Sequence, residues 1–370
     1  MRIQNVESPK FAGYDARPLK GFYMGSNTHN IAMEMQKIGK REGFKVFSKL
    51  TNGTFAACEE MNPKRMIYSY DDLWAQDIWT FLPQKLLTKI KQKDARPICN
   101  YFNISLDENN KHLSGGNMFI INMGDKDQIF VGEAELDKFS LQEIKERYDS
   151  DFVHVLPQMD YHLDLFIRPL DEKRVLVADD SYTIRVLEKG LDEFKQYIKN
   201  NWMERTSVAK TIISNFEVAI ANFKSQIELN KLPQTEDIVK KLKMSGVTPI
   251  RVPGRIYNTN FYDGYGTFLT HQCNYINASV LKNKDDDIVY ITNKSDIDDA
   301  LMLNTFITKN FKFRFQDEFV KSLSPFVKPE KVYFINGDNG YISTSMLPEL
   351  QGGIHCVCTE IPVEVGKSYE

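Results

Sequence analysis

Short apolar runs recur along the chain, and each begins after a polar residue and ends at Gly, Asp or Asn. They occupy Gln128–Gly132, Arg174–Asp179, Asp287–Asn293 and Lys331–Asn336. Their β-branched and aromatic residues predict strands. Because the runs are continuously apolar rather than alternating, both faces of each strand are expected to be covered, as in an α/β fold with helices packed on its sheets. Their recurrence suggests an internal repeat.

The apolar spacing changes to steps of three and four between Leu187 and Gly246. This spacing predicts two amphipathic helices, over residues 191–202 and 208–227. A third, shorter helix is predicted from Thr235 as its N-cap to Gly246 as its C-cap. Segment 187–246 is therefore expected to be a helical insertion between two strand-rich parts.

The composition limits the class of protein. The chain has 370 residues, of which 42% are hydrophobic, and its 47 Lys and Arg against 50 Asp and Glu give a net charge of −3. A nucleic-acid-binding protein normally carries a surplus of Lys and Arg, so no nucleic-acid partner is expected. No stretch approaches the ~18 apolar residues of a membrane helix, and the first residues lack the apolar run of a signal peptide. No membrane partner is expected either.

The five cysteines are sparse and scattered through the sequence. This pattern fits a reducing compartment better than a disulfide framework, and it favours a cytoplasmic location. Secretion by a leaderless route would leave no mark in the sequence and stays open.

The run GGIHCVCTE near the C-terminus contains Gly352, Gly353, His355, Cys356 and Cys358. Paired glycines allow positive φ or a close approach to a ligand, and a cysteine beside such a turn can be exposed and reactive. A buried cysteine pair is an alternative. A zinc site made of His355 and the two cysteines is disfavoured, because C-x-C lacks the usual two-residue gap and no second cysteine pair completes the ligand set.

Three further motifs carry polar side chains that could act together. In MDYHLDLF, His162 and Asp164 stand two apart in a strand-like stretch, so both are expected on one face. In DDLWAQDIW, Asp77 stands among aromatic residues, where burial would require a cationic partner. In SGGNMF, Asn117 follows two glycines, but the Lys of a phosphate-binding loop is absent.

The ordered set W-x-Q-D, G-G-N, H-L-D and G-G-x-H-C resembles the pentein superfamily of guanidine-modifying enzymes. This superfamily includes peptidylarginine, agmatine and free-arginine deiminases as well as amidinotransferases. The motifs extend from Trp74 to Glu360, over most of the chain. The resemblance implies a pseudo-symmetric five-bladed α/β propeller, forming a single catalytic domain over residues 1–370 with the helical insertion at 187–246.

The resemblance also implies a division of roles among four residues. Cys356 matches the nucleophile, His162 the general acid and base, and Asp77 and Asp164 the two carboxylates that hold the guanidinium. Two opposed carboxylates suit the planar fork of N–H donors on a guanidinium group. The implied reaction passes through a thiouronium intermediate on Cys356 and gives a ureido product, citrulline in the case of arginine, and ammonia.

Three more residues are expected to bind substrate. Trp74 is suited to pack along the aliphatic stem of an arginine, and Asn117 to order the loop that frames the pocket. Gln76 matches the Gln of peptidylarginine deiminases at a position where agmatine deiminases usually have Arg. The sequence therefore favours arginine in a protein or peptide as the substrate.

Other substrates and reactions stay open. A small guanidino compound such as agmatine or free arginine is one alternative, an amidinotransferase is another, and a non-catalytic binding scaffold is disfavoured because the four catalytic positions are all filled. Arg168, Arg251 and Arg255 could contact a substrate carboxylate, but a surface position is expected for each.

No cofactor and no metal ion are expected. The acidic run at residues 284–287 is a single cluster without the D-x-D-x-D-G pattern of a calcium loop. It is expected to be a solvated turn leading into the strand at Ile288. The sequence does not indicate an oligomeric state.

Overall fold

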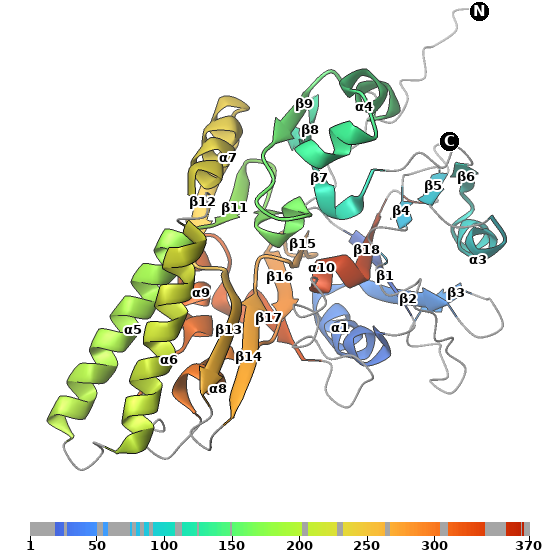
Figure 1. The fold of residues 1–370 in the computed structure, drawn as a ribbon. Helices are drawn as coiled ribbons and strands as arrows, with labels where there is room; N and C mark the ends of the chain where they lie inside the picture. Colours follow the sequence, from blue (N-terminus) through green and yellow to red (C-terminus); the bar gives the residue numbers. More distant parts are fainter. Residues whose placement is uncertain are drawn as a thin grey trace, which may run out of the picture.

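The computed structural model describes residues 19–25, 28–49, 55–57, 75, 79–81, 85–88, 92–107, 113–123, 126–148, 150–201, 206–227, 232–262, 267–303, 310–336, 353–363 and 365. Small sheets and helices alternate through these ranges (Figure 1). The predicted mixed α/β class is confirmed. All four predicted strands are present, as β8 (Lys126–Gly132), β11 (Arg174–Ala178), β16 (Ile288–Asn293) and β17 (Val332–Ile335), with ends that differ by one or two residues from the prediction.

Five sheets of the described chain contain the same unit, a central strand with one antiparallel and one parallel neighbour. The central strands are β1 (Leu19–Met24), β5 (Lys85–Thr88), β8, β11 and β16. Their antiparallel neighbours are β18 (Cys358–Pro362), β4 (Trp79–Phe81), β7 (Met118–Met123), β10 (Ile167–Pro169) and β15 (Ser279–Lys282). Their parallel neighbours are β2 (Lys45–Lys49), β6 (Ser105–Asp107), β9 (Val153–Leu156), β12 (Thr248–Val252) and β17. The sheets therefore repeat, as the recurring apolar runs suggest.

Helices connect the parallel strands, because a parallel pair cannot be joined by a tight hairpin. The connecting helices are α1 (His29–Glu42), α3 (Gln92–Phe102), α4 (Leu141–Tyr148), α8 (Ile297–Met302) and α9 (Phe315–Leu323). Between β11 and β12 the connection contains three helices, α5 (Asp180–Asn200), α6 (Ser207–Gln226) and α7 (Leu232–Met244). The predicted helical segment thus lies within the connection of one repeated unit.

The starts of two of these helices differ from the sequence-based prediction. Helix α5 begins earlier, at Asp180, because the Asp179 carboxylate caps it by accepting a hydrogen bond of 3.0 Å from the backbone N–H of Tyr182. Helix α7 begins at Leu232, so the prediction of Thr235 as its N-cap is wrong. The hydroxyl of Thr235 is instead buried and lies 3.0 Å from the sulfur of Met159.

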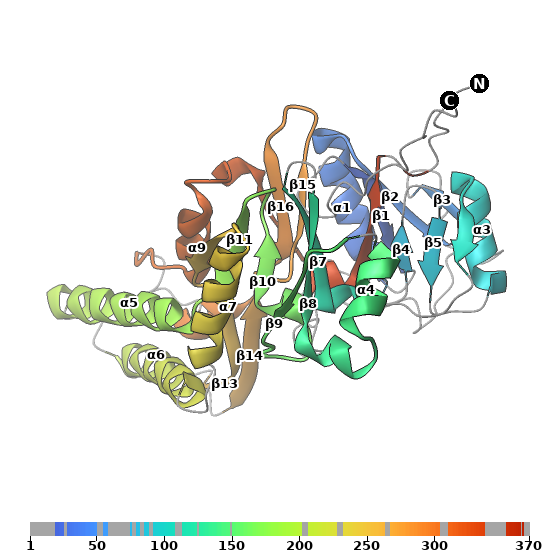
Figure 2. The ribbon, with the colours of Figure 1, turned by 90° about the horizontal axis from the view of Figure 1, so that it is seen from above.

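One apolar cluster joins the helical segment to the sheets. It contains Phe194, Phe216 and Phe223 of the helices together with Val177 and Tyr290 of the sheets. Helices α5 and α6 lie side by side at one end of the molecule, with the hairpin of β13 (Arg255–Tyr262) and β14 (Phe268–Asn274) beside them (Figures 1 and 2). None of the described helices is long and apolar enough to cross a membrane.

The described C-terminal segment contributes both a helix and a strand. The short helix α10 (Ile354–Val357) lies near the middle of the molecule and leads directly into β18 (Figure 1). Strand β18 pairs with β1, so the last described strand completes the sheet that the first one begins. Two short 3-10 turns bring other polar residues toward α10, at residues 115–117 and 163–165.

Candidate active site

Two asparagine side chains hold the turn that carries Cys356. The side-chain oxygen of Asn293 accepts a hydrogen bond of 3.0 Å from the backbone N–H of Ile354. The side-chain oxygen of Asn277 accepts from the backbone N–H groups of His355 at 3.0 Å and Cys356 at 3.3 Å. The first N–H groups of a helix have no partner within it, so these side chains satisfy them from outside. The position of Cys356 is fixed by segments far away in the sequence.

Gly353 is needed for packing rather than for a left-handed backbone. Its φ is −169°, which is extended. A Cβ atom at this position would lie 2.6 Å from both the Asn277 side-chain oxygen and the Asn293 side-chain nitrogen. The glycine lets the two asparagines approach the turn. Of the two possibilities left open by the sequence, an exposed thiol and a buried cysteine pair, the structure shows the buried one, since Cys356 is only 3% exposed.

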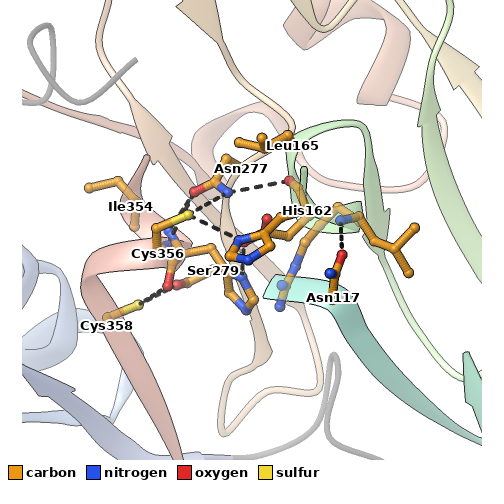
Figure 3. Close-up of polar contacts among 12 residues, drawn as sticks. Asn117, His162, Leu165, Asn277, Ser279, Ile354, Cys356 and Cys358 are labelled. Carbon is orange, nitrogen blue, oxygen red and sulfur yellow. Dashed lines mark hydrogen bonds and ion pairs between the residues drawn. The ribbon is translucent and has the colours of Figure 1, made fainter. Parts of the chain in front are cut away.

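The Cys356 thiol lies between an amide and a carboxylate. Asn277 donates a hydrogen bond of 3.1 Å from its side-chain nitrogen to Cys356 Sγ (Figure 3). Cys356 Sγ in turn lies 3.4 Å from Asp164 Oδ2, to which it can donate. The amide donor favours the thiolate, whereas the carboxylate favours the thiol.

Cys358 has different surroundings although it is only two residues away. Its Sγ lies 2.9 Å from the Ser279 hydroxyl and not at the Asn277 side chain that contacts Cys356 (Figure 3). Burial raises the pKa of Cys358 to about 12, despite the hydrogen bond with Ser279. Cys358 therefore stays protonated at neutral pH.

Within the part of the chain that the structure describes, no group of three or more His, Cys, Asp or Glu side chains could hold a metal ion.

His162 and Asp164 converge on one point, but not by lying on a strand as predicted. His162 has an extended backbone, and Asp164 lies in the 3-10 turn that follows it. A Cβ atom added to Gly116 would lie 2.4 Å from His162 Nδ1 and 3.1 Å from Asp164 Oδ1. Both side chains therefore pack directly over the backbone of Gly116, which explains a glycine at this position.

The His162 ring is held on two sides. Its Nε2 atom lies 3.0 Å from the hydroxyl of Ser114. The ring of Tyr161 lies against it, with ring centres 4.3 Å apart and an angle of 39° between the planes. His162 is only 8% exposed, whereas Tyr161 is 44% exposed. His162 thus lies just beneath the surface, with an aromatic side chain between it and solvent.

Asp164 is a buried carboxylate that stays ionised. Burial raises its pKa, but a hydrogen bond of 2.9 Å with His355 Nδ1, the charge on the His355 and His162 rings, and the contact with Cys356 bring the pKa below its ordinary value. Its Oδ2 atom makes the contacts with His355 and Cys356. Its Oδ1 atom is buried and accepts no hydrogen bond from the described part of the chain. A cationic N–H donor would satisfy this oxygen.

The side chain of Asn117 connects two loops. Its oxygen accepts hydrogen bonds from the backbone N–H of Leu163 at 3.1 Å and from the side chain of Gln158 at 2.9 Å. Its nitrogen donates to Glu135 at 3.1 Å, and Glu135 also accepts from the backbone N–H of Ser114 at 3.3 Å. The network holds the segment before Asp164 against the turn that contains Gly116.

The structure therefore brings together four of the seven site residues expected from the sequence, namely Cys356, His162, Asp164 and Asn117. The other three, Trp74, Gln76 and Asp77, lie outside the described residues.

Two residues of the site stand in no recognisable sequence motif. Asn277 stands in CNYINAS, where nothing distinguishes it from an asparagine in a turn. Glu135 stands in the acidic run GEAELD, which is typical of an exposed segment, yet it is fully buried. Only the fold brings these two residues to Cys356 and Asn117.

The expectation of a surface position is wrong for two arginines. Arg168 is buried and donates a hydrogen bond of 2.9 Å to Glu360. Arg255 is buried with its Nε atom 3.4 Å from Asp180. Buried guanidinium groups require carboxylate partners, and these partners come from other elements of the fold.

Comparison with known proteins identifies the fold. No family model matches the chain, and no curated protein matches it in sequence. The agmatine deiminase of C. jejuni is 12% identical, with a TM-score of 0.50 over 97% of this chain and 98% of that one. A protein with the provisional description of peptidyl-arginine deiminase is 13% identical, with a TM-score of 0.52 over 95% of this chain and 98% of that one. The chain thus shares its fold with pentein enzymes, as the motifs suggest.

Proposed function

We propose that the chain is a guanidine deiminase in which Cys356 attacks the guanidinium carbon of the substrate. The observation that carries this proposal is the Asp164 carboxylate, which is buried and ionised and has one oxygen at the thiol and the other without a donor in the described chain. A guanidinium group is a cation with N–H donors in a planar fork. When it binds at Oδ1, it lies beside Cys356.

The remaining site residues follow from the pentein resemblance. Asp77 is the second carboxylate for the guanidinium, Trp74 packs on the substrate stem, and Gln76 and Asn117 shape the pocket. For Asn117 the support is its network, since the side chain holds the loop before Asp164.

We also infer that the five repeated sheets are the blades of a five-bladed pseudo-symmetric propeller within one catalytic domain, residues 1–370. Segment 187–246 is then an insertion. The support is that most of the connections between parallel strands contain one helix, whereas the connection between β11 and β12 contains three.

The proposed reaction has two halves. In the first, Cys356 transfers its proton to His162, and Sγ then bonds to the guanidinium carbon, giving a tetrahedral adduct. Protonated His162 then donates a proton to the leaving nitrogen, the C–N bond breaks, ammonia departs and an S-alkylthiouronium remains on Cys356. In the second half, neutral His162 takes a proton from water, the oxygen attacks the same carbon and the C–S bond breaks, and the remaining hydroxyl proton passes to the released ammonia. The products are the ureido compound and the restored thiolate.

The charges around the site favour a substrate without a free α-carboxylate. Arg168 and Arg255 are buried against carboxylates of the chain, and Arg251 donates two hydrogen bonds, of 2.8 and 2.7 Å, to Glu236. These arginines are already neutralised, so they favour peptidyl arginine or agmatine over free arginine. Gln76 makes peptidyl arginine our first choice, with citrulline in the protein as product.

Agmatine is the second candidate. It is supported by the shared fold of the C. jejuni agmatine deiminase, and agmatine likewise carries no carboxylate. An amidinotransferase would begin with the same attack by Cys356, but an amine rather than ammonia would leave in the first half-reaction, and an amine would replace water in the second.

The first test is turnover of blocked arginine, agmatine and free arginine by the purified protein. Benzoyl-arginine amide serves as the blocked arginine, and ureido product and ammonia are measured together. We expect both products in equal amounts. The Cys356→Ser variant is expected to lose at least about 10³-fold in kcat, as is usual when a covalent nucleophile is removed. Cys358→Ser is the matched control and is expected to keep activity, because Cys358 is protonated and bonded to Ser279.

Three results would contradict parts of this proposal. Retained activity in Cys356→Ser would exclude the nucleophile. Amine release without ammonia, on addition of glycine as acceptor, would indicate an amidinotransferase. A preference for free arginine would contradict the argument from the neutralised arginines.

A further inference from the structure

His355 is the one chemically reactive side chain of the GGIHC motif that the proposed reaction does not use. Its Nδ1 atom lies 2.9 Å from Asp164 Oδ2, and the exposed fractions of the two side chains are 10% and 6%. Because an ionised carboxylate only accepts hydrogen bonds, Nδ1 carries the proton in this contact. His355 and the neighbouring Cys356 thus contact the same carboxylate, that of Asp164.

The other side of the His355 ring faces a second carboxylate. Nε2 lies 4.0 Å from Glu360 Oε1, and Arg168 donates to the same Glu360 oxygen at 2.9 Å. The backbone N–H of His355 is bonded to Asn277. The ring is therefore confined between Asp164 and Glu360, while Arg168 compensates the charge of Glu360.

We propose that His355 is a positioning residue that holds Asp164 Oδ2 and thereby keeps Asp164 Oδ1 turned toward the substrate cation. This inference rests on the proposed function for the identity of that cation, but not for the link between His355 and Asp164. A carboxylate without this bond could rotate about its Cβ–Cγ bond, since Cys356 would be the remaining contact of Oδ2 among the described residues. The productive orientation of the guanidinium would then be lost.

The same contact keeps Asp164 ionised. Burial raises the pKa of Asp164, and the hydrogen bond with His355 is the largest of the effects that lower it. Other titratable groups lie near this pair. His162 and Cys356 lie beside Asp164, Glu360 lies beside His355, and the charge of Asp164 also acts on Cys358. Of these, His162 also stabilises the Asp164 charge. Loss of His355 should therefore raise the pKa of Asp164.

Two substitutions at His355 separate the hydrogen bond from the volume of the ring. His355→Leu removes both ring nitrogens and keeps an apolar side chain of moderate size. His355→Asn places an amide N–H near the position of Nδ1 and can restore the bond to Asp164. His271→Leu is the control, because His271 Nδ1 lies 3.1 Å from Asp296 in a second His–Asp pair, for which no hydrogen bond or ion pair to Cys356, His162, Asp164 or Asn117 is found among the described residues.

The activity readout is the pH profile of kcat/KM. For His355→Leu we expect a loss of about 10²-fold at neutral pH, which is typical of a misplaced binding group. Its acid limb should also move to higher pH, because Asp164 is protonated more readily. His355→Asn should recover most of the loss, and His271→Leu should match the wild type. An unmoved acid limb in folded His355→Leu, or an Asn variant no better than Leu, would overturn the inference.

A second readout does not depend on the substrate. The rate of Cys356 alkylation by iodoacetamide is measured between about pH 5 and 9 by mass spectrometry, and Asp164, at 3.4 Å from the thiol, influences this rate. In the wild type Asp164 is ionised throughout, so its titration adds no inflection to this profile. In His355→Leu an additional inflection should appear as Asp164 titrates. Its absence would overturn the inference, whereas inactivity of the wild type toward every guanidine would overturn only the proposed function.

Discussion

Asp164 keeps its negative charge because a few close donors compensate for its burial. The bond from His355 and the charge of His162 offset the desolvation of the carboxylate. His162 and Asp164 lie this close together over the Gly116 backbone because that residue has no side chain in the space that they occupy. The geometry of the candidate site therefore depends on one absent methyl group as much as on the polar residues.

Gly116→Ala should remove activity without unfolding the protein. The new Cβ would lie 2.4 Å from His162 Nδ1, so the ring or the turn must move. A displacement on this scale is expected to lower kcat/KM by about 10²-fold or more. The measurement is steady-state turnover, with circular dichroism to establish the fold.

Gly43→Ala is the control for this substitution. Gly43 ends α1 at a φ of 91°, and its Cβ would meet no atom within 4 Å. It should lower stability by about 1 kcal/mol through its left-handed backbone and leave turnover unchanged. Wild-type activity in folded Gly116→Ala would show that His162 and Asp164 do not need their present positions.

At this scale the sequence allows a prediction only where a motif marks the residue. Cys356, His162, Asp164 and Asn117 each stand in a short pattern that resembles a known one, and the structure brings them together. Asn277 and Glu135 also hold site residues in place, but neither stands in a recognisable sequence motif. A single buried amide or acid acquires its partners only when distant segments meet in the fold. The prediction of a surface position for Arg168 is wrong for the same reason, because its partner Glu360 is distant in the sequence.

Among the elements, a buried ion pair joins β10 to β18. Arg168 on β10 and Glu360 on β18 are 1% and 6% exposed and lie 2.9 Å apart. Strand β18 follows directly after α10, so the pair also fixes the strand that anchors the turn with Cys356. Elements distant in the sequence are thus held together next to the candidate site.

Arg168→Met should strongly destabilise the protein, because it leaves the Glu360 carboxylate buried without its main partner. The expected loss in the free energy of unfolding is about 3–5 kcal/mol, measured by urea denaturation. The double variant with Glu360→Met should regain much of this loss, since apolar side chains can replace a buried ion pair at little cost. A single variant as stable as the wild type would mean that the pair adds no stability.

The elements were predictable where their apolar pattern is long or continuous. The buried strands and the two long helices follow directly from their sequence patterns. Helix starts are harder to predict, because a capping residue competes with tertiary contacts. Thr235 has the chemistry of an N-cap, but its hydroxyl packs against Met159 and α7 begins earlier.

At the level of the whole molecule, the same small sheet is repeated, and the recurring apolar runs along the chain indicate this repeat only weakly. Each of the repeated sheets pairs a central strand with one antiparallel and one parallel neighbour. In one of them the antiparallel neighbour of β1 is β18, so this unit combines the two ends of the described chain and is not continuous in the sequence. Irregular spacing between the apolar runs concealed this repeat. The helical segment shares its apolar cluster with the sheets, so it is packed as part of the same body.

The proposed reaction depends on a covalent bond between Cys356 and the substrate carbon, and the most direct test is the mass of the trapped intermediate. The wild-type protein is mixed with benzoyl-arginine amide or agmatine, quenched in acid during turnover and analysed by mass spectrometry. We expect an added mass equal to the substrate minus ammonia, located on the peptide that contains Cys356 and absent in Cys356→Ser. Product formation without any adduct on Cys356, or an adduct on another residue, would contradict it.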